Sequence, residues 1–277
     1  MGVGQMPRIA VPSLMPPSPK TEYSHPRCYL KCTADCSRQM SREHYISENI
    51  LRNFTRLRVS GMPWQEMGDE KFLPASSLVA NILCSRHNNA LSPLDRLAGH
   101  TFDSLVAAAD YAVNQRHEGR IAHHLVSGHA LELWMYKLMA GIYFGGIAAA
   151  NGSRVRDTCC FPETEIAGYL TEGTLAPNGG MYVTQNVGLI PRSDIGVAPL
   201  IDAETDTCVG VQVQFGPLRF ETTVIHPNLP TNHQAIMAQR RRPHAIDYSG
   251  PSRDARIVLT WPRTKGAFNR LGLQVRP

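Results

Sequence analysis

Cysteine and histidine residues gather in the first third of the chain at spacings that suit a metal ion. Cys28-x3-Cys32 offers two thiolates, and Cys84-x2-His87 offers a third thiolate and an imidazole. Three sulfur ligands and one nitrogen ligand form a common tetrahedral zinc site. Cys36 can take the place of either Cys28 or Cys32. The sequence therefore predicts a structural zinc ion that holds together a segment with little core of its own, unless these thiols are unrelated neighbours.

Two polar pairs lie beside these candidate ligands. Glu43-His44 occurs in the stretch SREHYIS, and Asn88-Asn89 directly follows His87. Metal-assisted hydrolysis of a phosphodiester needs a general base next to a hard cation. Neighbouring residues of a strand point to opposite sides, so Glu43 and His44 can reach the same phosphate only if a strand ends there. A carboxamide oxygen of Asn88, or of Asn89, at the start of a helix is a suitable second ligand for Mg2+.

Taken in order, the residues Cys…Cys…SREHYIS…ILCSRHNN resemble the HNH endonuclease family, in its zinc-knuckle branch with a ββα-metal fold, over residues 28–96. The resemblance implies that Glu43 and Asn88 bind a catalytic cation, Mg2+ or Mn2+. It implies that His44 deprotonates the attacking water. It also implies a structural zinc ion with the ligands Cys28, Cys32, Cys84 and His87.

Three positions depart from the family pattern. Ser47 stands where the family usually has proline, and three residues rather than two separate Cys28 from Cys32. His87 stands where the family has a fourth cysteine. The last two departures leave the zinc ligand set open, with Cys36 as an alternative ligand. They also allow His87 to be the family's terminal histidine at the catalytic cation.

The expected function is metal-dependent hydrolysis of phosphodiester bonds in DNA, and RNA remains open as a substrate. By analogy, bacterial and phage proteins with such small N-terminal modules often serve in defence or in mobile elements. The alternative is a zinc-stapled module that binds nucleic acid or another protein without catalysis. Three observations distinguish these functions. A nuclease cleaves DNA in a divalent cation, and a nucleic-acid-binding module binds DNA without cleaving it. A protein-binding module shows no salt-dependent DNA binding. A homodimer or a regulatory partner is compatible with each.

Basic side chains provide candidate contacts to phosphates. Residues 240–277 contain nine Lys and Arg but only two Asp and Glu, a balance that attracts a polyanion. The candidates for phosphate contact are Arg52, Arg56, Arg240, Arg241 and Arg242. The same arginines are equally compatible with a solvated surface.

The number of cysteines and the hydropathy of the first residues indicate the cellular compartment of the protein. The chain has seven cysteines, an odd number, and its proline-rich start lacks the uninterrupted apolar core of a signal peptide. Both features favour a reducing compartment, so we expect a cytoplasmic protein without membrane association. The stretch 130–150 is apolar, but Glu132 and Lys137 favour a buried helix of a soluble core over a membrane span. The two charges are expected either to be satisfied by neighbours or to be buried functional groups.

The elements expected to position these residues belong to the α+β class. Ser92-Pro93-Leu94-Asp95 carries the signals of a helix start. Apolar residues at helical spacing predict a long helix over about 118–150 and a shorter one over 163–170. Runs of β-branched residues predict an antiparallel meander over about 180–261, with a last strand near 256–261. The expected organisation is a flexible Pro-rich arm (1–27), an HNH-like zinc-knuckle module (28–96), and a helical and antiparallel β domain of unknown role with a basic C-terminal end (97–277).

Overall fold

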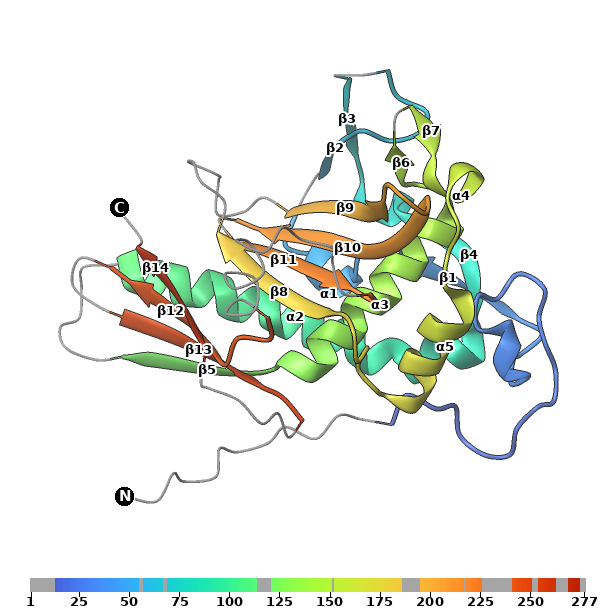
Figure 1. Ribbon diagram of the computed structural model, residues 1–277, viewed down its shortest axis with the longest axis horizontal. Coiled ribbons are helices and arrows are strands. Elements are labelled where there is room, and N and C mark those ends of the chain that lie inside the picture. Colours follow the sequence, from blue (N-terminus) through green and yellow to red (C-terminus); the bar gives the residue numbers. More distant parts are fainter. Residues whose placement is uncertain are drawn as a thin grey trace.

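A computed structural model of the chain describes residues 13–54, 57–66, 69–113, 121–150, 152–185, 195–216, 218–225, 241–250, 254–262 and 269–274. These described residues form an α+β fold, which confirms the class expected from the sequence. One four-stranded sheet and a small ββα unit pack against the central helix α3 (Gly128–Gly145), and a second four-stranded sheet packs mainly against helix α2 (Ser85–Val113) (Figure 1). None of the helices in this part of the chain is both long and apolar enough to span a bilayer.

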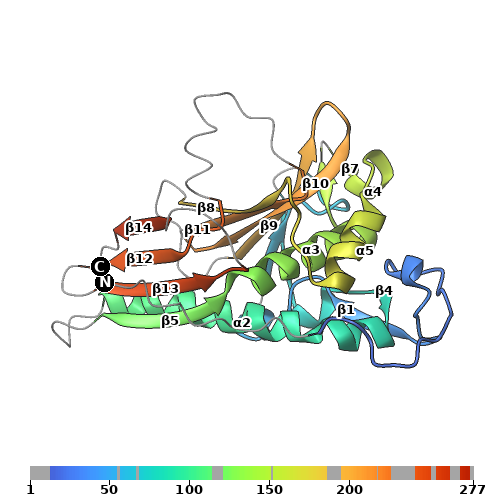
Figure 2. The ribbon, with the colours of Figure 1, turned by 60° about the horizontal axis from the view of Figure 1, so that its bottom comes forward.

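The ββα unit contains the residues expected to do chemistry. Strands β1 (Met40–His44) and β4 (Val79–Cys84) pair antiparallel, and helix α2 (Ser85–Val113) begins directly after β4. From the ββα unit, α2 runs along the molecule to the β5 and β13 side (Figure 2). Shorter elements fill the connections: η1 (Lys31–Thr33), α1 (Glu48–Leu51), β2 (Leu57–Ser60), β3 (Glu70–Leu73) and η2 (Ala75–Ser77).

One four-stranded sheet is antiparallel throughout, in the order β8-β11-β10-β9. The predicted strands are present, but β8 pairs with β11 and not with β9, so the sheet is not the simple meander expected. The connection over residues 186–194 is longer than a hairpin loop, and therefore does not oblige β8 and β9 to pair. The strands are β8 (Gly180–Gln185), β9 (Ile195–Asp202), β10 (Thr207–Phe215) and β11 (Leu218–Thr223).

The second four-stranded sheet is mixed, in the order β14-β12-β13-β5. β12 pairs antiparallel with β13, whereas the β12–β14 and β13–β5 pairs are parallel. The last strand expected from the sequence is β13, and it belongs to this sheet. The strands are β5 (Ala122–Ser127), β12 (Ala245–Ser249), β13 (Asp254–Thr260) and β14 (Arg270–Gln274).

The long helix predicted over 118–150 is shorter in the structure. Residues 122–127 form strand β5, α3 begins at Gly128 and ends at Gly145, and 114–120 lie outside the described residues. The pattern missed a helix start: the Ser127 hydroxyl caps α3 by accepting a hydrogen bond from the Ala130 N–H. The expected burial of the apolar part is confirmed. The shorter helix is α5 (Glu163–Glu172), preceded by β6 (Ala149–Ala150), β7 (Ser153–Arg154) and α4 (Val155–Thr158).

The helix start predicted at Ser92 is also wrong, because α2 begins seven residues earlier and contains Pro93. Proline has no N–H, so Pro93 cannot donate to the carbonyl of Asn89 four residues before it. The Ser92 hydroxyl donates to that carbonyl instead, at 2.9 Å. Ser92 and Pro93, which suggested a helix cap, therefore lie inside a continuous helix, where the serine hydroxyl makes the hydrogen bond that proline cannot make.

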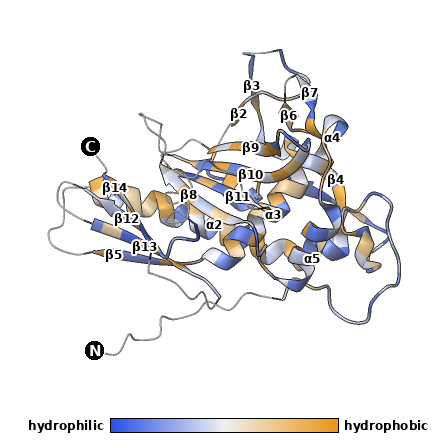
Figure 3. Cartoon of the chain, in the orientation of Figure 1, coloured by the Kyte–Doolittle hydropathy of each residue, from blue (hydrophilic) through white to orange (hydrophobic). Residues whose placement is uncertain are grey.

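Two of the expected boundaries are not supported by the packing. The boundary between 96 and 97 falls inside α2, and one main core joins the ββα unit to both sheets. Apolar residues are accordingly spread over all these elements (Figure 3). Of the arm expected to be flexible, 1–12 lie outside the described residues, whereas Leu14 is buried in the main core. Leu14 is a single apolar residue in a proline-rich segment, so no periodic pattern in the sequence predicted that it packs in the core.

Candidate metal centre and catalytic cavity

The structure brings three cysteines and one histidine together at the start of α2. The candidate ligand atoms of Cys28, Cys36, Cys84 and His87 all lie within 4.8 Å of one another, and all four residues are buried. Cys84 is the last residue of β4, and His87 lies in the first turn of α2. Cys28 and Cys36 lie on either side of η1. The chain therefore builds a Cys3His group from three separate segments.

The distances within this group fit a tetrahedral metal ion such as zinc. The His87 Nδ1 atom lies 3.6 Å from the sulfur of Cys28, 3.7 Å from that of Cys36 and 3.2 Å from that of Cys84. With Zn–S bonds of about 2.3 Å and Zn–N bonds of about 2.0 Å, a tetrahedral ion separates sulfur from nitrogen by roughly 3.5 Å.

A hydrogen bond fixes the tautomer of His87 that a metal requires. The Thr33 hydroxyl donates its hydrogen to the Leu30 carbonyl oxygen at 2.8 Å. That hydroxyl therefore accepts, at 3.0 Å, from the His87 Nε2–H. Nδ1 then carries no hydrogen, and its lone pair faces the three sulfurs. Metal-bound histidines commonly have such a partner on the second ring nitrogen.

The predicted ligand set needs one correction, because Cys36 and not Cys32 completes the group. Cys32 lies within η1 and is exposed, whereas Cys28 and Cys36 are each 1% exposed. The helical turn of η1 directs the middle cysteine outward. His87 belongs to the thiol group, so the structure does not place it as a terminal histidine at a second cation.

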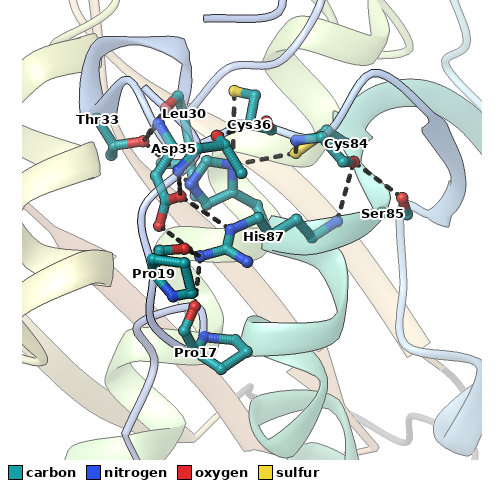
Figure 4. A network of polar contacts seen from close by, with 12 residues as sticks. Pro17, Pro19, Leu30, Thr33, Asp35, Cys36, Cys84, Ser85 and His87 are labelled. Carbon is teal, nitrogen blue, oxygen red and sulfur yellow. Dashed lines mark hydrogen bonds and ion pairs between the residues drawn. The ribbon is translucent and has the colours of Figure 1, made fainter. Parts of the chain in front are cut away.

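A polar network surrounds the Cys3His group and fixes its segments to one another (Figure 4). The Arg86 guanidinium binds both carboxylate oxygens of Asp35, at 2.9 and 3.2 Å. It also donates to the carbonyl oxygens of Pro17 and Pro19. The hydrogen bond between the two thiols lowers the pKa of Cys84 well below its usual value and raises the pKa of Cys28, so Cys84 is the thiolate of this pair. A lowered pKa favours the thiolate, which is the metal-binding form.

The expected catalytic residues line one cavity of about 280 Å³ between the end of β1 and the first turns of α2. His44 is the last residue of β1, and both Glu43 and His44 border the cavity. A register irregularity between Ser41 and Glu43 precedes this strand end. Strand β1 therefore ends at Glu43 and His44, which is the condition under which these two neighbouring residues can reach the same phosphate.

Helix α2 supplies the opposite wall. Asn88, Ser92 and Asp95 all border the cavity, and their spacing of four and three residues places them on one helix face. The Asn88 carboxamide N–H donates to the Ser41 hydroxyl at 2.8 Å, which turns the carboxamide towards β1. Asn89 is exposed and does not border the cavity. Of the two asparagines considered as cation ligands, Asn88 is the one that borders the cavity.

Three further residues of this site, Arg42, Asp95 and Arg96, were missed as functional candidates, and Lys137 was considered only as a buried charge without an assigned site. Arg42 and Arg96 are exposed residues on its border, and Asp95 lies inside it. The Lys137 ammonium, from α3, forms ion pairs with both Glu43 and Asp95. Only the charge of Lys137 in an apolar stretch was a signal, and nothing in the sequence pointed to its partners.

Opposing effects set the pKa values of Glu43 and Lys137. Burial raises the pKa of Glu43 above its usual value, although the Lys137 ammonium acts in the opposite direction. Burial would lower the pKa of Lys137, but Asp95 and Glu43 reverse this effect and raise it. Lys137 is therefore a buried ammonium held between two carboxyl groups.

The predicted phosphate-contacting arginines are not gathered at this cavity. Arg52 is exposed and lies 4.0 Å from the carboxylate of Asp103. Arg241 donates to the carbonyl oxygens of Pro177 and Gly179. Arg242 forms two charge-assisted hydrogen bonds, of 2.8 and 2.9 Å, with the fully buried carboxylate of Glu132. Arg56 and Arg240 lie outside the described residues.

The Arg242–Glu132 contact predicts a structural role for Arg242. Because Arg242→Met leaves the Glu132 carboxylate buried without its cation, we expect the free energy of unfolding to fall by about 3–5 kcal/mol. Urea denaturation of the two proteins measures this loss. Unchanged stability together with weaker DNA binding would instead identify Arg242 as a phosphate contact.

No protein-family model matches the chain, and neither the curated proteins nor the solved structures contain a match to it.

Proposed function

We propose that this protein is a metal-dependent endonuclease of the HNH type that hydrolyses phosphodiester bonds in DNA. The observation that carries the proposal is the meeting of Glu43, His44 and Asn88 at one cavity, at the strand end and helix start of a ββα unit. The neighbouring Cys3His group supports it further, because a structural zinc ion there would fix β4, the start of α2 and the η1 segment together.

Each residue has a proposed task. The Glu43 carboxylate and the Asn88 carboxamide oxygen hold the cation at the scissile phosphate. When bound, Mg2+ or Mn2+ supplies charge that stabilises the transition state and the leaving oxygen. His44 accepts the proton of the attacking water, and no hydrogen bond engages its imidazole within the described part of the chain. Arg42 and Arg96 attract the phosphates that flank the cut.

The experiment that tests this function is a cleavage assay on supercoiled plasmid, with the zinc-loaded protein in Mg2+, Mn2+ or EDTA. A nuclease nicks or linearises the plasmid in the divalent cations and not in EDTA. A zinc-stapled binding module retards the plasmid in a gel but leaves it supercoiled under every condition. A protein-interaction module does neither, and shows no salt-dependent DNA affinity.

The two neighbouring asparagines allow a matched comparison. We expect Asn88→Ala to raise the Mn2+ concentration needed for half-maximal cleavage by at least about 10–100-fold, because removal of an outer group that only supports a ligand already has an effect of this size. Asn89→Ala should leave it unchanged, because that side chain is exposed and lies off the cavity. Cleavage measured against Mn2+ concentration gives both values. An equal response of the two variants would remove Asn88 from the cation site.

A further inference from the structure

A buried cation from outside the ββα unit pairs with two carboxylates that border the proposed catalytic cavity. Lys137 lies on α3, and its side chain is only 4% exposed. A lysine ammonium is rarely buried unless it is paired, because removing its charge from water costs much free energy. Both of its partners, Glu43 and Asp95, border the proposed catalytic cavity. The lysine is therefore part of the surroundings of that cavity and not of a distant core.

The ion pairs use one oxygen of each carboxylate. The Lys137 Nζ atom contacts Glu43 Oε1, and it lies 2.5 Å from Asp95 Oδ2. Within the described residues, no hydrogen bond engages the second oxygen of either carboxylate. Each carboxylate is thus held from behind by the ammonium and keeps one oxygen for another ligand.

Close packing leaves α3 little freedom to move away from β1. A Cβ atom added at Gly145 would lie 2.1 Å from the Tyr45 ring, so the helix passes directly against the residue that follows His44. Asp95 is fixed on the other side, since its backbone carbonyl accepts a hydrogen bond from the Ser47 hydroxyl at 3.0 Å. The ammonium therefore joins three elements, β1, α2 and α3, at the back of the cavity.

We propose that Lys137 is a positioning residue of the catalytic cation site, which aligns the carboxylates of Glu43 and Asp95 towards a cation in the cavity. The inference rests on the proposed function. It gives helix α3, which lies outside the ββα unit, a part in positioning the catalytic residues, because the ββα unit alone lacks this ammonium. Outer groups that orient a metal ligand typically change metal affinity or activity by about 10–100-fold when removed.

The test compares Lys137→Met with Arg242→Met. Each variant removes a cation that pairs with a buried acidic residue, but the Arg242–Glu132 pair does not border the cavity. We would measure Mn2+ binding to the zinc-loaded proteins from the electron paramagnetic resonance signal of free Mn2+. Single-turnover cleavage of a labelled DNA duplex and urea denaturation would be measured on the same samples. Lys137→Arg, which keeps the charge, completes the set.

We expect Lys137→Met to weaken Mn2+ binding and slow cleavage by at least tenfold, while Arg242→Met loses stability but keeps both values. Lys137→Arg should recover part of the loss. Mn2+ binding by Lys137→Met that is as tight as in the native protein, or tighter, would overturn the inference even if cleavage is observed. If the native protein binds Mn2+ but cuts no DNA, the proposed nuclease function fails, and the binding measurement still decides the role of Lys137.

Discussion

Cys84→Ser is expected to abolish tight zinc binding and to unfold the segment around η1. Cys84 joins β4 to α2 and faces the ring of His87, so its loss removes a thiolate from the centre of the ligand group. Binding of a structural zinc ion contributes about 10–16 kcal/mol in zinc-finger peptides. Because the three cysteines of the group also lie in the main core, we expect a loss of several kcal/mol in stability and not complete unfolding.

The matched control is Cys32→Ser. Cys32 is a neighbouring thiol, but it is exposed and lies outside the ligand group. Zinc content by mass spectrometry of the native-state protein and thermal denaturation with and without a chelator give the comparison. Cys32→Ser should retain the zinc and the melting temperature of the native protein. Loss of zinc in Cys32→Ser, with retention in Cys36→Ser, would restore the ligand set expected from the sequence.

His44→Ala is expected to slow DNA cleavage by about 100- to 10,000-fold, the usual contribution of a general base. The side chain is partly exposed at the end of β1, so its removal should leave folding, zinc content and DNA affinity nearly unchanged. Single-turnover rates on a labelled duplex at saturating Mn2+ measure the loss of chemistry without product release. Added imidazole should restore part of the rate if a missing base is the cause.

His123→Ala controls for the loss of an imidazole. His123 is an exposed residue of β5, in the sheet at the far end of the molecule from β1 (Figure 1). It should cleave as the native protein does. A similar loss in both variants, or a loss in His44→Ala that follows its stability, would contradict a catalytic role for His44.

The sequence indicated candidate residues for the site better than their arrangement. Glu43, His44 and Asn88 stood out as candidates because they lie close along the chain to cysteine and histidine residues that could bind a metal. The choice between Cys32 and Cys36 depended on a single turn, η1, whose local conformation has no periodic signal. Spacing alone favoured the nearer cysteine, but the turn buries the farther one.

Contacts between distant segments could not be predicted in this way. Lys137 lies 42 residues from Asp95 along the chain, and no pattern within either helix relates the two. The same holds for β5, whose residues fit a helical repeat but form a strand because β13 lies alongside them. The helix start predicted at Ser92 was wrong for a different reason. The Ser92 hydroxyl makes a hydrogen bond that Pro93 cannot make, so the helix continues through the proline.

The central claim is that a cation held by Glu43 and Asn88 works with His44, beside a separate Cys3His metal centre. The most direct measurement is the plasmid cleavage rate of the dialysed, zinc-loaded protein as Mn2+ is added, with His44→Ala in parallel and zinc determined in every sample. The account predicts that native cleavage rises from zero with Mn2+ at constant zinc, while His44→Ala stays near zero. Cleavage that needs no added cation, or that survives in His44→Ala, would contradict it.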